Sequence, residues 1–215
     1  MSLPLTVLIA DDHALMREGL AELLARYPDI KVIATAADGR SAVRLAREHL
    51  PDVAILDISM PEMNGIDTIS ELALRAPAVK VIMLSMHSSA QHVMHALAAG
   101  ARGYLLKQSA VSEVADAVRS VAAGRRYLTA AVAEIIAEQI GKPAVADRFT
   151  SLSRRERQIL QLVVEGKSSA AIGVDLNLSA KTVDTYRSRL MQKLGVKDLA
   201  ALIKLSILHG LTPLE

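Results

Sequence analysis

Short apolar runs alternate with segments of helical length throughout the first 124 residues of the chain. The runs have the length and aliphatic content of β-strands, and they lie at residues 6–10, 30–36, 53–57, 79–85 and 101–106. Segments with helical periodicity follow them at residues 13–27, 39–50, 65–76, 89–100 and 110–124. This strict alternation predicts a parallel sheet with helices on both faces.

The predicted sheet can be wound in few ways, because crossover connections between parallel strands are right-handed. We expect an α/β flavodoxin-like fold with a five-stranded parallel sheet in the order 2-1-3-4-5. The run Val53 to Leu56 is aliphatic throughout, as in a strand covered on both faces, yet it ends on Asp57. A single Asp after a strand is more often an ordinary turn residue than a functional one.

Polar residues stand at the ends of the other predicted strands as well. Asp11 and Asp12 follow the first strand, Ser85 ends the fourth and Lys107 follows the fifth. The carboxyl ends of parallel strands meet at one edge, so these side chains should converge with Asp57. Three carboxylates repel one another unless a cation lies between them, and an all-oxygen ligand set favours Mg²⁺.

This group of side chains indicates phosphoryl transfer to a carboxylate. An ionised Asp57 can attack phosphorus to give an aspartyl-phosphate. Lys107 offers a positive charge to the arriving phosphoryl group, and Ser85 offers a hydroxyl.

Composition and charge divide the chain. Apolar residues make up 51% of it and aromatic residues 2%, so the core should be aliphatic, and there is no Cys. Residues 1–124 carry 11 Lys and Arg against 14 Asp and Glu, whereas residues 150–215 carry 10 against 6. Net charges of −3 and +4 indicate two domains with different partners, nucleic acid being the candidate for the basic one. The absence of a signal-peptide pattern or a long apolar run leads us to expect a cytoplasmic protein without membrane contact.

A second, helical domain is predicted after a connecting segment. We expect a phosphoacceptor domain at 1–124, a linker containing a helix capped by Thr129 at 125–151, and a small all-α domain of four helices at 152–215. Ser153 and Glu156 form a capping-box pattern. The helices predicted at 168–176 and 180–194, the latter capped by Ser179, have the spacing of a helix-turn-helix.

The helix at 180–194 carries apolar residues on one face and small polar or basic residues on the other, as in helices that enter the DNA major groove. The outward face and its edges include Lys181, Thr182, Asp184, Thr185, Ser188 and Arg189. The same pattern would also suit an ordinary solvated helix. The positive charge of the domain and the helix-turn-helix spacing favour DNA binding.

About the first 120 residues resemble the receiver domains of two-component response regulators, through Asp11, Asp12, Asp57, Ser85 and Lys107. The resemblance implies that Asp57 takes a phosphoryl group from a sensor histidine kinase. It implies that Asp12, Asp57 and the Ser59 carbonyl bind Mg²⁺, with Asp11 acting through water. It also implies a switch in which Ser85 turns toward the phosphoryl group and Tyr104 moves into the vacated space. Gln108 departs from the proline that many receivers place after the lysine.

The segment from Leu152 to Val196 resembles the LuxR-type DNA-binding domain, and the whole chain resembles the NarL/FixJ class of response regulators. The resemblance implies structural pairing of Glu156 with Arg187, and it implies DNA contacts. The implied contacts are Lys181, Thr182, Asp184, Thr185, Ser188, Arg189 and Lys193. Gly173 stands where the class often has alanine, and we expect it to loosen its helix by about 0.5 to 1 kcal/mol.

The sequence therefore predicts a transcription regulator in which phosphorylation of Asp57 favours a homodimer bound to paired half-sites on double-stranded DNA. One alternative is a DNA-binding regulator controlled by protein contacts without phosphorylation. The other is a Mg²⁺-dependent aspartyl phosphatase, but such enzymes carry the nucleophile in an Asp-x-Asp pattern, and Ile58-Ser59 follows Asp57 here. We expect no enzymatic turnover beyond slow self-dephosphorylation.

Overall fold

The computed structural model describes residues 3–86, 88–138 and 148–208. Two compact units divide the chain, residues 1–141 and 142–215. Residues 139–147 of the segment predicted as a linker lie outside the described residues.

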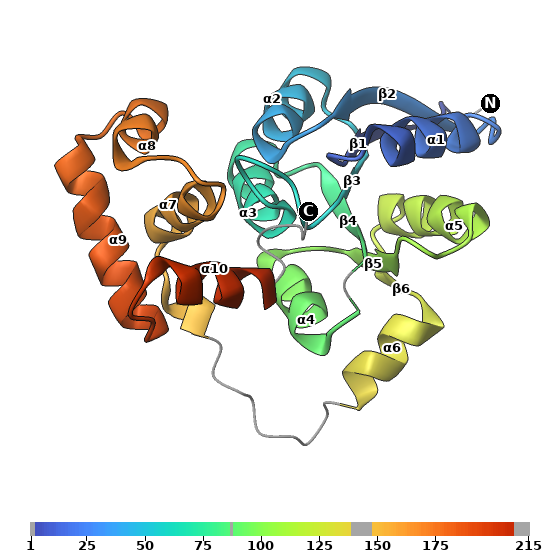
Figure 1. Ribbon diagram of the computed structural model, residues 1–215. Helices are drawn as coiled ribbons and strands as arrows, with labels where there is room; N and C mark the ends of the chain where they lie inside the picture. Colours follow the sequence, from blue (N-terminus) through green and yellow to red (C-terminus); the bar gives the residue numbers. More distant parts are fainter. Residues whose placement is uncertain (1–2, 87, 139–147, 209–215) are drawn as a thin grey trace. The chain divides into compact units, whose positions relative to one another are not determined.

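The first unit contains a parallel sheet whose strand order is β2-β1-β3-β4-β5-β6 (Figure 1). The strands are β1 Leu5–Ala10, β2 Ile30–Ala36, β3 Val53–Leu56, β4 Lys80–Ser85, β5 Gly103–Leu106 and β6 Tyr127–Leu128. The predicted five-strand order is confirmed. The two-residue strand β6, which pairs in parallel with β5, was not predicted because it is too short to show alternation.

Helices cover both faces of this sheet, as the alternation of strands and helices predicted. The helices of the unit are α1 Ala14–Leu24, α2 Gly39–His49, α3 Gly65–Arg75, α4 Ala90–Ala99, α5 Val111–Ala122 and α6 Ala130–Ala137. Alternate strand residues enter two cores. Val7, Ile9 and Ile55 pack with residues of α1 and α5, whereas Leu8 and Leu56 pack on the face covered by α2, α3 and α4.

Helix α6 lies within the segment predicted as a linker. Thr129 caps it as predicted, because its hydroxyl accepts a hydrogen bond from the Val132 amide at 3.4 Å. Val132 is fully buried in the core that includes α2, α3 and α4, and Ile136 packs against the same core. The helix is therefore packed into the first unit.

The second unit is helical. Its elements are the 3₁₀ helix η1 Arg148–Ser151 and the helices α7 Arg154–Val164, α8 Ser169–Leu176, α9 Ala180–Leu194 and α10 Leu199–Leu208. The predicted capping box at Ser153 and Glu156 and the predicted cap at Ser179 are both confirmed. Its core is formed by buried, mainly aliphatic residues of all four α-helices, including Ile159 of α7 and Leu190 of α9.

Gly173 has a packing role that the sequence did not indicate. It is buried in α8, and a β-carbon placed on it would lie 2.6 Å from the Leu178 carbonyl oxygen. The Leu178 amide donates a hydrogen bond of 2.8 Å to the Gly173 carbonyl. Our expectation that glycine simply loosens this helix was incomplete. Because Gly173 has no side chain, the turn that contains Leu178 can pack directly against α8.

Candidate functional site

The carboxyl edge of the sheet brings together the polar residues singled out in the sequence. Leu56 lies beside Ala10 in the register of β1 and β3, so Asp57 and Asp11 leave neighbouring strands side by side. The Asp57 amide donates to the Ala10 carbonyl at 2.8 Å, and the Lys107 amide donates to the Ser85 carbonyl at 2.9 Å. The sheet register thus places these four positions at one edge.

Lys107 links the acidic side chains. Its ammonium lies 2.7 Å from Asp11 Oδ2 and 2.9 Å from Asp57 Oδ2. The other oxygen of Asp57, Oδ1, accepts a hydrogen bond of 2.8 Å from the Ile58 amide. All three charged side chains are buried, so the predicted convergence of Asp11, Asp57 and Lys107 is confirmed.

Burial and charge act against each other at Asp57. Desolvation raises the pKa of this carboxyl to about 6, even though the charge and hydrogen bond of Lys107 favour ionisation. The nearby Asp11 adds to the increase. Burial acts to lower the pKa of Lys107, but the two carboxylates outweigh it and the net shift is upward. At neutral pH the site therefore holds an ionised Asp57 and a charged Lys107.

The loop between β1 and α1 is held by residues that the sequence analysis missed. Arg17, on the first turns of α1, donates a hydrogen bond of 2.6 Å to the Asp11 carbonyl. The His13 amide donates to Asp11 Oδ1 at 2.9 Å, and His13 Nδ1 lies 2.7 Å from Asp12 Oδ1. The sequence signal for these roles was weak: His13 directly follows the acidic pair, and Arg17 comes four residues later.

Helix α3 begins directly against the loop that follows Asp57. The Gly65 amide donates to the Ile58 carbonyl at 2.8 Å, and a β-carbon on Gly65 would lie 2.1 Å from the Asp57 carbonyl oxygen. Asn64 caps the helix through the Asp67 amide. Glycine is therefore required at position 65, because any side chain there would prevent the start of α3 from packing against the Asp57 backbone.

The acidic cluster fits a divalent cation. Asp11, Asp12 and Asp57, together with His13, each offer one ligand atom, and these atoms all lie within 4.8 Å of one another. Opposite ligands of an ion with bonds of about 2.1 Å are about 4.2 Å apart, so the groups need only small adjustments. The carboxylates also supply the oxygen donors that Mg²⁺ prefers.

Ser85 and Tyr104 lie under the site. Both side chains are fully buried, and the Tyr104 phenol is hydrogen-bonded to Ser85. Desolvation raises the pKa of Tyr104 to about 12, with a further contribution from the charge of Asp57. Tyr104 is therefore already inside the core in this structure, and its predicted movement after phosphorylation stays a prediction. Ser59, the other predicted ligand, is buried two residues beyond Asp57.

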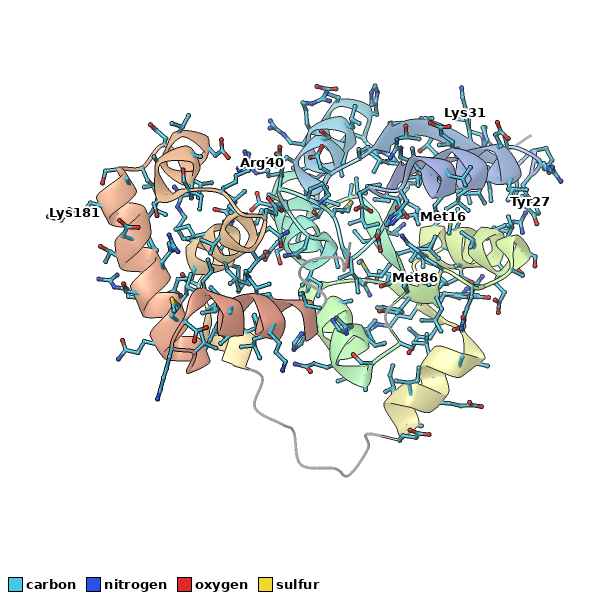
Figure 2. All side chains as sticks on the ribbon, in the orientation of Figure 1. Met16, Tyr27, Lys31, Arg40, Met86 and Lys181 are labelled. Carbon is cyan, nitrogen blue, oxygen red and sulfur yellow. The ribbon has the colours of Figure 1, made fainter. Side chains whose placement is uncertain are left out.

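A second candidate site lies on α9. Lys181, Asp184 and Thr185 are exposed, as are Ser188 and Arg189. Figure 2 shows Lys181 projecting outward from the helix. The hydroxyl of Thr182 lies 2.8 Å from that of Ser179 at the start of the helix. The outward face of α9 therefore presents the polar groups predicted for it.

The predicted pairing of Glu156 with Arg187 is wrong. The partner of Glu156 is Lys193, whose ammonium lies 2.7 Å from Oε2 and 3.2 Å from the Ser151 carbonyl. Arg187 instead donates to the Ser169 hydroxyl at 3.0 Å, which itself donates to Asp184 at 2.6 Å. The spacing of residues along a helix predicts which way a side chain points, but not how far a long side chain reaches. Lys193, in the last turn of α9, extends far enough to contact Glu156.

Comparison with known proteins defines the class. The response regulator receiver domain matches residues 7–119, and the luxR family of bacterial regulatory proteins matches residues 150–206. The chain therefore belongs to the two-component response regulators. Its combination of a receiver with a LuxR-type DNA-binding domain is that of the NarL/FixJ class of transcription regulators.

Similar proteins share nearly the full length. Response regulator UvrY of Escherichia coli (strain K12) is 38% identical over 212 residues, which cover 98% of this chain and 97% of UvrY. Transcriptional regulatory protein DegU of Brevibacillus brevis is 36% identical over 220 residues, covering 95% of this chain and 93% of DegU.

Solved structures of similar fold include RcsB of Salmonella typhimurium, with a TM-score of 0.62 and 26% identity over 95% of this chain and 98% of that one. A structure of an RcsB–DNA complex has a TM-score of 0.60 and 25% identity over 94% of this chain and 96% of that one. Among the residues that the structure describes, no helix is long and apolar enough to cross a membrane.

Proposed function

We propose that Asp57 accepts a phosphoryl group from a sensor histidine kinase and that this modification controls DNA binding by the LuxR-type domain. The observation that carries the proposal is Lys107, whose ammonium bridges Asp57 and Asp11 inside an acidic cluster. A buried lysine held between two carboxylates is positioned to meet negative charge arriving at either one.

Asp57 acts as the nucleophile. A carboxylate oxygen forms the new bond to phosphorus, while the bond between phosphorus and the histidine nitrogen of the donor breaks. Lys107 then balances the added charge from 2.9 Å away. The Ile58 amide holds the second carboxylate oxygen and so orients the group.

Mg²⁺ would neutralise phosphoryl oxygens when bound, held by Asp12, Asp57 and the Ser59 carbonyl, with Asp11 contributing through water. Arg17 and the His13 amide fix the loop that presents these acids. The slow loss of phosphate expected here is self-dephosphorylation, and no turnover of an external substrate is proposed.

The phosphorylated state would be sensed through Ser85 and Tyr104. A phosphoryl oxygen is a stronger acceptor than a phenol, so it competes for the Ser85 hydroxyl that now contacts Tyr104. Tyr104 is buried against the core that also contains residues of α4 and α6. A change at Ser85 would thereby reach the surface formed by α4, β5 and α5, where we propose that a homodimer forms.

Recognition of DNA would use the outward face of α9 in the major groove. We assign base or phosphate contacts to exposed or partly exposed groups on that face: Lys181, Thr182, Asp184, Thr185, Ser188 and Arg189. Lys193 was predicted to join them, but its ion pair with Glu156 supports a mainly structural role. A dimer would contact half-sites about ten base pairs apart.

Intact-mass spectrometry of the full chain with Mg²⁺ and acetyl phosphate tests the phosphorylation step. We expect one added phosphoryl group on the wild type and none on Asp57→Asn. Asp52→Asn serves as the matched control, since Asp52 precedes the opposite end of the same strand and hydrogen-bonds Thr6. Equal labelling of wild type and Asp57→Asn would contradict the assignment.

A further inference from the structure

We infer that Ser169 is a positioning residue for base recognition. Its hydroxyl holds the Asp184 carboxylate so that the second carboxylate oxygen accepts a hydrogen bond from the amino group of a cytosine in the major groove. This inference rests on the proposed entry of α9 into the groove, and it names the base that one residue of α9 reads. Ser169 itself lies on α8, outside the set of residues assigned to DNA contact.

Two hydrogen bonds join Asp184 to Arg187 through the hydroxyl of Ser169. Arg187 donates to Ser169 Oγ at 3.0 Å, and Ser169 Oγ donates to Asp184 Oδ1 at 2.6 Å. A guanidinium can only donate and an ionised carboxylate can only accept, so both bonds have a fixed direction. Because the Ser169 hydroxyl accepts from Arg187, its single proton is directed to Asp184.

This link orders a side chain that is otherwise exposed. Asp184 lies in the second turn of α9, close to the helix start that reads base edges in helix-turn-helix domains. An aspartate on a solvated helix face samples several rotamers, and fixing one of them on binding costs conformational entropy. The distance of 2.6 Å is typical of the strong hydrogen bond that a hydroxyl gives to an ionised carboxylate. Ser169 therefore orders Asp184 before DNA arrives.

The ordered carboxylate keeps acceptor sites for a base. An ionised carboxylate has about four lone-pair sites on its two oxygens, and Ser169 uses one of those on Oδ1. In the major groove, cytosine presents an amino donor that a carboxylate can accept. Adenine also presents an amino donor, but its neighbouring N7 is an acceptor that repels a carboxylate. Asp184 is therefore suited to cytosine.

Removal of the Ser169 hydroxyl should change base preference more than overall affinity. In Ser169→Ala the Asp184 carboxylate loses its donor from α8, so it is no longer held toward one base. The basic residues of α9 that contact phosphates are unchanged, and these contacts supply most of the affinity that is independent of sequence. Ser169→Thr keeps a hydroxyl at the same position and should keep the preference.

Selection from a pool of randomised duplex DNA, followed by sequencing, tests the inference in the full chain with Mg²⁺ and acetyl phosphate. The wild type should prefer cytosine at one position of each half-site. Asp184→Asn and Ser169→Ala should each reduce this preference by about threefold or more at the same position, whereas Ser169→Thr should retain it. Asp175→Asn is the matched control, because Asp175 is a carboxylate of α8 that pairs with Lys167 at 2.8 Å. It should leave every base preference unchanged.

The possible results separate a positioning role from a structural one. If Ser169→Ala lowers the unfolding temperature or the affinity for all sequences equally and keeps the wild-type base preferences, the inference is overturned. A wild-type site without a cytosine that responds to Asp184→Asn would also overturn it. In both cases sequence-specific binding by the wild type would leave the proposed function standing. A wild type that selects no DNA sequence would count against the proposed function, and the inference would fall with it.

Discussion

Lys107 and Asp57 form an ion pair of 2.9 Å in which each side chain is only 5% exposed. The pair joins the ends of β3 and β5, which are separated by β4 in the sheet. Burying these charges is costly, and the raised pKa of Asp57 shows that Lys107 compensates only in part. The protein therefore maintains a destabilised carboxylate at the position where we propose that phosphorylation occurs.

The first prediction is that Asp57→Asn stabilises the fold at neutral pH. Desolvation raises the pKa of Asp57 to about 6 from an ordinary value of 3.8, so ionisation costs more in the folded than in the unfolded chain. The wild type should lose stability relative to Asp57→Asn as pH rises from about 4 to about 6, by up to about 3 kcal/mol. Urea unfolding of both proteins across this range, without divalent cations, measures the difference. A difference independent of pH would mean that Asp57 ionises normally in the fold.

A second prediction concerns the helix start that touches Asp57. Gly65→Ala places a β-carbon against the Asp57 carbonyl and should displace that residue, reducing phosphoryl uptake by about tenfold or more. Stability should fall by roughly 1 to 3 kcal/mol. The control is Gly19→Ala in α1, where the added carbon meets nothing within 4 Å and should stabilise by about 1 kcal/mol. Phosphorylation of Gly65→Ala at the wild-type rate would show that the close contact is not needed.

The third prediction separates two lysines of α9. Lys193 neutralises the buried Glu156, whose pKa is lowered because Lys193 and Ser153 outweigh desolvation. Lys193→Met should destabilise the second unit by about 1 kcal/mol at neutral pH, a cost that fades as pH falls through the acid range and Glu156 protonates. Lys181→Met should leave stability unchanged. It should reduce the slope of the logarithm of the DNA-binding constant against the logarithm of salt concentration by about one. The reverse pattern in thermal unfolding and salt titrations would contradict these roles.

A fourth prediction follows from the turn between α8 and α9. Gly173→Ala gains helix propensity but drives a β-carbon into the Leu178 carbonyl. We expect the free energy of unfolding to fall by about 1 kcal/mol. DNA binding should also weaken, because the turn sets the position of α9. Chemical unfolding measures the loss. If the variant is instead more stable by about 1 kcal/mol, propensity outweighs packing and the simpler expectation from the sequence was sufficient.

The sequence predicted the strand order and the convergence of Asp11, Asp57 and Lys107, because parallel topology sends strand ends to one edge. It did not predict the contact of His13 with Asp12 or of Lys193 with Glu156. Those contacts depend on side-chain conformers and on distances between elements. A pattern along the chain specifies which face a residue occupies, but not which neighbour a flexible side chain reaches.

The most direct test of the central claim is DNA binding by the full chain with and without acetyl phosphate, in Mg²⁺, using genomic fragments and comparing wild type with Asp57→Ala. The account predicts that the phosphodonor tightens binding by the wild type and leaves the variant unchanged. Equal binding by both proteins, with and without the phosphodonor, would contradict phosphate control and leave a DNA-binding regulator governed by protein contacts.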